Sequence, residues 1–171
     1  SKKEFIPFEI KDILKSVSRF NINNLLITGG EPLVQDEVYI LMKKLLKHKY
    51  KVSLETNGSI LIDKVPKKVH IILDLKTPGS GMNKKNNLNN LKYLKKTDEI
   101  KFVITGRKDF LWSIKQIKKF NLEKKFIVLI SPVRDNVSFS EISDWILNSG
   151  LNLKLNLQIH KIIWPGTERK R

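Results

Sequence analysis

The chain has 171 residues, of which 40% are hydrophobic, a size and content typical of a single domain with a buried core and not of a disordered chain. Its 33 Lys and Arg residues outnumber its 17 Asp and Glu residues, which gives a formal net charge of +16. Lysine is spread through every segment together with much Asn and Ile, so we interpret the charge as a compositional bias. We expect no direct binding of nucleic acid as the main function.

The sequence contains no cysteine, which excludes a disulfide, a zinc–thiolate site or an iron–sulfur cluster held by these 171 residues. Its histidines, His48, His70 and His160, are too scattered to predict a metal site. No apolar stretch approaches the roughly 20 residues that span a bilayer, and the opening SKKEFIPFEI lacks an apolar signal core. We therefore expect a cytoplasmic protein without a membrane partner.

The hydrophobic pattern predicts helices and strands in alternation. Helices are expected over residues 9–20, from about 34 to 46, 86–96, 109–119 and 138–148, and strands over 24–28, 51–55, 70–75, 99–105, 125–131 and 151–160. Ser138 and Glu141 form a Ser-x-x-Glu capping box at the start of the last helix. The last strand alternates strictly between apolar and polar residues, which suits an edge position with one wet face. The sum is one α/β domain over residues 1–171 with a largely parallel sheet of about six strands.

Special residues follow four of these strands, at the end where ligands of parallel sheets bind. They are Gly29-Gly30-Glu31-Pro32, Glu55-Thr56-Asn57-Gly58, the stretch from Asp74 to Gly81, and Ser131-Pro132. A glycine pair adopts backbone angles closed to other residues and lets a ligand approach the main chain. One such turn is equally explained as a tight βα connection without a ligand. Four turns that converge on one edge predict a binding site.

Five motifs in these turns and strands carry a family resemblance: TGGEPL, ETNGS, DLKTPGSGM, KFVIT and LQIHKIIWPG. Together they resemble the radical S-adenosylmethionine superfamily, and within it the 7-carboxy-7-deazaguanine synthase family. Gly-Gly-Glu-Pro alone indicates the superfamily, whereas Lys-x-Pro-x-Ser-Gly-Met and Gln-x-His-Lys indicate the synthases. The resemblance extends from about residue 5 to the end of the chain. It implies a partial, incomplete radical-SAM-type β/α barrel with helices outside.

The resemblance also implies roles for individual residues. Three segments would bind S-adenosylmethionine: Gly29, Gly30 and Glu31; Asp74, Leu75 and Lys76; and Ser131, Pro132, Val133 and Arg134. Thr28, Glu55, Asn57 and Pro165 would lie on the substrate side. Glu31 could instead brace its turn, and Glu55 and Asn57 could simply close theirs. The second segment keeps only the lysine of the family's Ser-Pro-Lys, and the third has Ser131-Pro132 where the family usually has Gln-Pro. His160 and Lys161 are expected to anchor the last strand.

The implied activity is that of a radical-SAM carbon–nitrogen lyase of queuosine biosynthesis, a tRNA modification pathway. It converts 6-carboxy-5,6,7,8-tetrahydropterin to 7-carboxy-7-deazaguanine with loss of ammonia. The family uses S-adenosylmethionine, a [4Fe–4S] cluster held by three cysteines, Mg²⁺, a reductant protein such as flavodoxin or ferredoxin, and a homodimer. Because the sequence has no cysteine, these 171 residues alone are expected to be inactive. We expect that the family's amino-terminal strand and cluster loop are missing from them.

Three alternatives stay open at the level of sequence. The first is a cysteine-free relative that binds ligand without radical chemistry. The second is another radical-SAM enzyme, such as a glycyl-radical activating enzyme, against which the LQIHKIIWPG ending argues. The third is a non-catalytic nucleotide- or RNA-binding α/β domain that uses the same strand ends and the basic surface.

Overall fold

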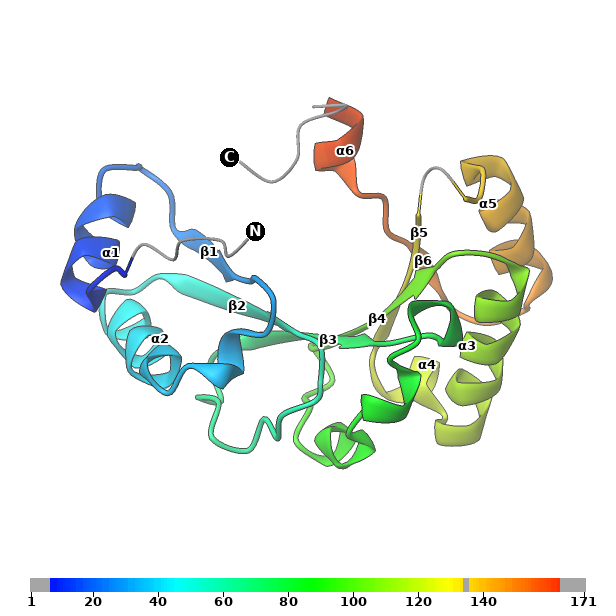
Figure 1. The fold of residues 1–171 in the computed structure, drawn as a ribbon, viewed down its shortest axis with the longest axis horizontal. Helices are drawn as coiled ribbons and strands as arrows, with labels where there is room; N and C mark the ends of the chain where they lie inside the picture. Colours follow the sequence, from blue (N-terminus) through cyan, green and yellow to red (C-terminus); the bar gives the residue numbers. More distant parts are fainter. Residues whose placement is uncertain (1–6, 134–135, 164–171) are drawn as a thin grey trace.

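The structure, a computed structural model, describes residues 7–133 and 136–163. Six parallel strands form one sheet in the order β1-β2-β3-β4-β5-β6, so each strand pairs with its neighbour in sequence. They are β1 (Asn24–Ile27), β2 (Lys51–Thr56), β3 (His70–Leu75), β4 (Glu99–Ile104), β5 (Ile127–Pro132) and β6 (Lys154–Leu155). The sheet curves but does not close, because β1 and β6 are its two edges, as Figure 1 shows. The predicted incomplete β/α barrel is confirmed.

Helices lie in the connections from β1 to β2, from β4 to β5 and from β5 to β6, while α1 precedes β1 and α6 follows β6. Of these helices, α2 and α3 pack on the convex side of the curved sheet (Figure 1). The α-helices are α1 (Ile10–Val17), α2 (Glu37–Lys47), α3 (Arg107–Phe120), α4 (Leu122–Lys125), α5 (Phe139–Asn148) and α6 (Ile159–Ile163). Short 3₁₀ turns lie at Pro32–Val34, Pro78–Ser80, Asn83–Lys85 and Leu88–Lys92. The predicted capping box starts α5, where the Glu141 N–H donates to Ser138 Oγ at 3.2 Å. Within the described part of the chain, no helix is both long and apolar enough to cross a membrane.

The core lies between the sheet and the helices of its convex side. Alternate strand residues such as Leu54, Leu73 and Phe102 are completely buried there, together with Met42 of α2 and Ile117 of α3. The residues between them point to the opposite, concave face and are only half-buried along β2 and β4. Parallel strands covered on both sides usually carry apolar residues on both faces. Here the concave face carries charged residues instead, and these form the candidate site described below.

The predicted helix over residues 86–96 is wrong. The structure forms only the 3₁₀ turns there, because asparagine side chains bond the backbone of distant turns instead of leaving it to a helix. Asn86 pairs through its amide with both the N–H and the C=O of Lys76. Asn90 is completely buried, accepts from the Ile62 N–H and donates to the Gly58 carbonyl. These asparagines therefore join the segment by hydrogen bonds to the loops that follow β2 and β3.

The predicted strand over residues 151–160 is also wrong in its extent, although its edge position is confirmed. Only Lys154 and Leu155 pair with β5. Leu155 and Ile159 are 37% and 59% exposed, so the alternation does not mark one buried face. The chain then turns into α6, so His160 and Lys161, which were expected to anchor the last strand, lie in a helix that follows it.

Candidate functional site

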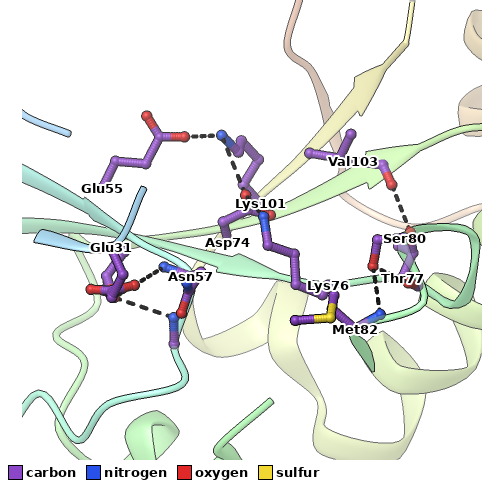
Figure 2. A network of polar contacts seen from close by, with 12 residues as sticks. Glu31, Glu55, Asn57, Asp74, Lys76, Thr77, Ser80, Met82, Lys101 and Val103 are labelled. Atoms are coloured by element: carbon purple, nitrogen blue, oxygen red, sulfur yellow. Dashed lines mark hydrogen bonds and ion pairs between the residues drawn. The ribbon is translucent and has the colours of Figure 1, made fainter. Parts of the chain in front are cut away.

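The carboxyl ends of β1 to β5 meet at one edge of the sheet, and four of them carry the turns singled out in the sequence. Because the strands are parallel and adjacent, side chains from different turns reach one another across this edge. Figure 2 shows the resulting polar network on β2, β3 and β4 and in the loops that follow β1, β2 and β3. The predicted convergence of the first three turns is therefore present in the structure.

A row of alternating charge crosses three strands, and we call it the charged row. It consists of Glu55 on β2, Lys101 on β4, Asp74 on β3 and Lys76 just beyond β3. Lys101 Nζ donates to Glu55 Oε1 and lies 3.9 Å from Asp74 Oδ2, and Lys76 Nζ lies 2.7 Å from the same Asp74 oxygen. Thr28 extends the row at the end of β1, where its hydroxyl donates to Glu55 Oε2 at 3.3 Å. Two predicted substrate residues, Thr28 and Glu55, are thus brought together.

The charged row is largely shielded from water. The side chains of Asp74 and Lys101 are 10% and 13% exposed, and those of Glu55 and Lys76 are 26% and 32% exposed. The two carboxylates and two ammonium groups balance, which offsets much of the cost of removing charges from water. One atom is left out: Asp74 Oδ1 is buried and has no hydrogen-bond partner among the described residues. A buried carboxylate oxygen without a donor is uncommon, and it suits a ligand that brings an N–H or O–H group.

Glu31 braces the first turn against the second. Its carboxylate accepts hydrogen bonds from the Leu33 N–H at 3.1 Å, the Thr56 hydroxyl at 2.8 Å and the Asn57 N–H at 2.7 Å. Figure 2 shows Glu31 beside Asn57 of the second turn. Asn57 in turn closes its own turn by accepting from the Ser59 N–H at 2.9 Å. The bracing role considered for Glu31 is therefore present, while a contact of Glu31 or Asn57 with ligand stays a prediction.

The glycine pair leaves open space above the main chain. A Cβ built on Gly29 or on Gly30 would meet no atom within 4 Å. Steric crowding within the described part of the chain is therefore not the reason for a glycine at either position. At Gly29 the φ of +157° itself favours glycine, whereas at Gly30 close approach of a ligand to the backbone is a remaining reason for a glycine.

The loop after β3, Thr77–Met82, is fixed by bonds within itself and to β4. The Thr77 hydroxyl donates to the Val103 carbonyl at 2.9 Å, and the Ser80 hydroxyl donates to the Thr77 carbonyl at 2.6 Å (Figure 2). The Met82 N–H donates to Ser80 Oγ at 3.2 Å. This loop contains the Pro-x-Ser-Gly-Met part of the family motif, and it follows directly on Lys76 of the charged row.

Asp109, in the first turn of α3, accepts hydrogen bonds that fix the position of the same loop. One carboxylate oxygen accepts from the Gly79 N–H at 2.8 Å, and the other accepts from the Thr105 N–H at 3.1 Å and the Thr105 hydroxyl at 2.5 Å. Burial raises the pKa of the Asp109 carboxyl, but these hydrogen bonds lower it by more, so its pKa lies below the ordinary 3.8. A Cβ at Gly79 would collide with Thr105 Oγ1 and Asp109 Oδ2, so only glycine fits.

The remaining predicted site residues are either buried or paired with neighbouring strands, or they lie outside the described residues. The Leu75 side chain is in the core at 2% exposure, so only its main chain is left for a ligand. Ser131 and Pro132 are buried at the end of β5, paired with β4, and the Val133 N–H donates to the Ile104 carbonyl at 2.9 Å. Arg134 and Pro165 lie outside the described residues.

Sequence reasoning missed Lys101 and Asp109. Lys101 opens the KFVIT motif and is a charged residue between the buried Ile100 and Phe102, a signal that could have marked it. Asp109 looks like an ordinary acidic residue of a first helical turn, and nothing local reveals its bond to a loop 30 residues away. The described residues contain no group of three or more His, Cys, Asp or Glu side chains that could hold a metal ion.

The chain resembles curated proteins over most of its length, although no family model matches it. It is 37% identical over 164 residues to the 7-carboxy-7-deazaguanine synthase of Clostridium acetobutylicum, covering 93% of this chain and 74% of that protein. It is 31% identical over 163 residues to the synthase of Chlorobaculum tepidum, covering 94% and 74%. The synthase of Koribacter versatilis is 38% identical over 157 residues, covering 83% and 70%.

Solved structures share the fold at lower sequence identity. QueE from Escherichia coli matches with a TM-score of 0.68 and 20% identity, covering 88% of this chain and 64% of that one. SuiB from Streptococcus suis, solved with S-adenosylmethionine bound, matches with a TM-score of 0.60 and 18% identity, covering 94% and 46%. The chain thus spans less than two thirds of the length of either structure.

Proposed function

Since the chain belongs to the 7-carboxy-7-deazaguanine synthase family, we propose that its concave face binds S-adenosylmethionine and a pterin, and that it serves in the lyase reaction of that family. The pterin is 6-carboxy-5,6,7,8-tetrahydropterin, which is converted to 7-carboxy-7-deazaguanine with loss of ammonia. The charged row supports this proposal more than any other observation. It places mostly buried donors and acceptors of both signs on the concave face of the sheet.

The residues present suit S-adenosylmethionine. Its methionine part carries an ammonium group, and the unpaired Asp74 Oδ1 is an acceptor for such a donor. The open space over Gly29 and Gly30 admits a ligand against the main chain. We assign Ser131, at the end of β5, to the far wall of the same site. When bound and reductively cleaved, S-adenosylmethionine supplies the radical chemistry of the family, and these residues orient it and exclude water.

On the substrate side we place Thr28 and Glu55, because the hydroxyl and the carboxylate are bonded to each other and face the concave side. The Glu31 brace keeps the turns after β1 and β2 at a fixed separation. The site is therefore preorganised for two ligands side by side, which is what a reaction between a cofactor and a substrate requires.

The [4Fe–4S] cluster does not fit the residues present, since the sequence has no cysteine. We propose that the ligands of the cluster come from outside these 171 residues. Mg²⁺ keeps several oxygen ligands from water and substrate in many sites, and we propose that the pterin supplies part of its shell here. A cytoplasmic homodimer reduced by a flavodoxin or ferredoxin completes the proposal.

The deciding experiment is reconstitution of the complete gene product with iron and sulfide under anaerobic conditions. With a reductant, S-adenosylmethionine and the pterin, we expect 7-carboxy-7-deazaguanine by mass spectrometry, and no product from the 171-residue chain treated identically. A complete product that lacks cysteine, or that binds a cluster without converting the pterin, would refute the enzymatic proposal. A ligand-binding relative of the synthases would then be the better description.

A further inference from the structure

Lys101 occupies the centre of the charged row and opens the KFVIT motif, but the sequence analysis assigns it no role. It lies on β4 with its side chain on the concave face, 13% exposed, between Glu55 of β2 and Asp74 of β3 (Figure 2). Removing an ammonium group from water is costly unless its N–H groups find acceptors. The question is therefore which acceptors Lys101 has.

An ammonium group has three N–H donors, and the described residues occupy only part of this capacity. Lys101 donates to Glu55, but Asp74 Oδ2 is 3.9 Å away, beyond hydrogen-bond distance. Asp74 is instead hydrogen-bonded by Lys76 at 2.7 Å, so that carboxylate already has a close cation. Among the described residues, Lys101 thus keeps donor capacity on a face that the Proposed function assigns to ligands.

The balance of charges within the charged row also points to Lys101 as the partner of a ligand carboxylate. Without ligand the two carboxylates and two ammonium groups cancel, so any added carboxylate would lie beside Glu55 and Asp74 and be repelled by both. A ligand carboxylate is tolerated there only next to a cation that is not already satisfied. Each of the two cations makes one hydrogen bond to a carboxylate, Lys76 to Asp74 and Lys101 to Glu55, so burial distinguishes them: the Lys76 side chain is 32% exposed and that of Lys101 is 13% exposed. Lys101 is the better partner because it is more buried, where a charge-assisted bond is stronger.

We propose that Lys101 is a ligand-binding residue of this site, whose ammonium group donates to the carboxylate of the bound ligand. The inference rests on the proposed function, in which both ligands carry a carboxylate: the methionine part of S-adenosylmethionine and the 6-carboxylate of the pterin. The shared chemistry is the carboxylate, and the two sources are separated by experiment.

The test compares each ligand with an analogue that lacks only the carboxylate. S-adenosylmethionine is paired with S-adenosylmethioninamine, and 6-carboxypterin with pterin, each titrated calorimetrically into wild type and Lys101→Met. For whichever ligand uses Lys101, the variant should lose about 10- to 100-fold in affinity, the range for a hydrogen bond to a charged group. Its carboxylate-free analogue should change by less than about threefold. Lys101→Arg, which keeps the charge, should recover most of the loss.

Two controls separate recognition from structural damage. Lys115→Met removes an exposed lysine of α3 and should leave all four affinities unchanged. Because Lys101→Met also deprives Glu55 of its cation, the comparison is repeated in a Glu55→Gln background, where the selective loss should persist. Equal loss for both members of each pair, or no loss for any, would overturn the inference. If wild type binds none of the four compounds, the proposed binding function fails, and the role of Lys101 fails with it.

Discussion

Replacing Asp109 by Asn should loosen the loop that carries the family motif, by an amount that follows from its three hydrogen bonds. The amide keeps one acceptor oxygen, and its best orientation retains the two bonds from Thr105. Its NH₂ group then faces the Gly79 N–H, so that this bond is lost and two donors oppose each other. Bonds to charged groups contribute about 1.5–3 kcal/mol each, and the retained pair weakens as the charge is lost. We therefore expect a loss of about 2–4 kcal/mol in the free energy of unfolding.

The pH dependence has a definite sign. Because the pKa of folded Asp109 lies below its unfolded value, near 3.8, the carboxylate contributes stability that is fully present above that pH. The contribution is lost as the pH falls through the lower, folded pKa. The difference in stability between wild type and Asp109→Asn should therefore be constant from pH 5 to 7 and shrink below about pH 3.8.

Urea denaturation followed by circular dichroism measures the effect, provided that the slope of the transition is the same in both proteins. Asp144→Asn, an exposed change on α5, is the matched control and should alter stability by less than about 0.5 kcal/mol. If Asp109→Asn were no more destabilising than this control, or if its deficit were the same at pH 3 as at pH 7, the argument that the carboxylate holds the loop would be refuted.

Three further substitutions probe separate features. Gly79→Ala should destabilise the fold by about 1–3 kcal/mol through its collision with two side chains, whereas Gly106→Ala, whose Cβ meets nothing within 4 Å, should not; urea midpoints compare them. Gly30→Val should abolish binding of S-adenosylmethionine with an unchanged melting curve, because the side chain fills open space; unaltered affinity by calorimetry would contradict this. Asn90→Ala should lower the free energy of unfolding by about 2–4 kcal/mol, since it leaves the buried Ile62 N–H without its acceptor, and a change under 0.5 kcal/mol would contradict this.

The sequence predicted the sheet well because its first five strands are specified by local patterns. In β2 and β4 alternate residues are buried, and each strand ends at a glycine, proline or polar turn. The same local logic located the capping box at Ser138, whose geometry depends on residues only three positions apart. Features that depend on near neighbours in sequence were predictable for this physical reason.

The errors arose where distant contacts decide the conformation. The segment around Asn90 has helical spacing, but its amide bonds turns about 30 residues earlier, and those bonds take precedence. The last strand has the alternation of a half-buried strand, yet its neighbour β5 pairs with only two of its residues. Neither outcome is contained in the local pattern, since both depend on which groups the folded sheet brings near.

The candidate site contains residues that local sequence motifs predict and one residue, Lys101, whose position depends on contacts between strands. Glu55, Asp74 and Lys76 each follow from a recognisable turn, and taken singly each could be an ordinary strand-end residue. Lys101 belongs to no turn, but the parallel register sets it directly beside Asp74 and within reach of Glu55. Lys101 joins Glu55 to the Asp74–Lys76 pair, and the result is a neutral, mostly buried network that leaves one carboxylate oxygen unpaired. A fold gains nothing in stability from such an atom, so a ligand that supplies the missing donor is the most direct reason for it.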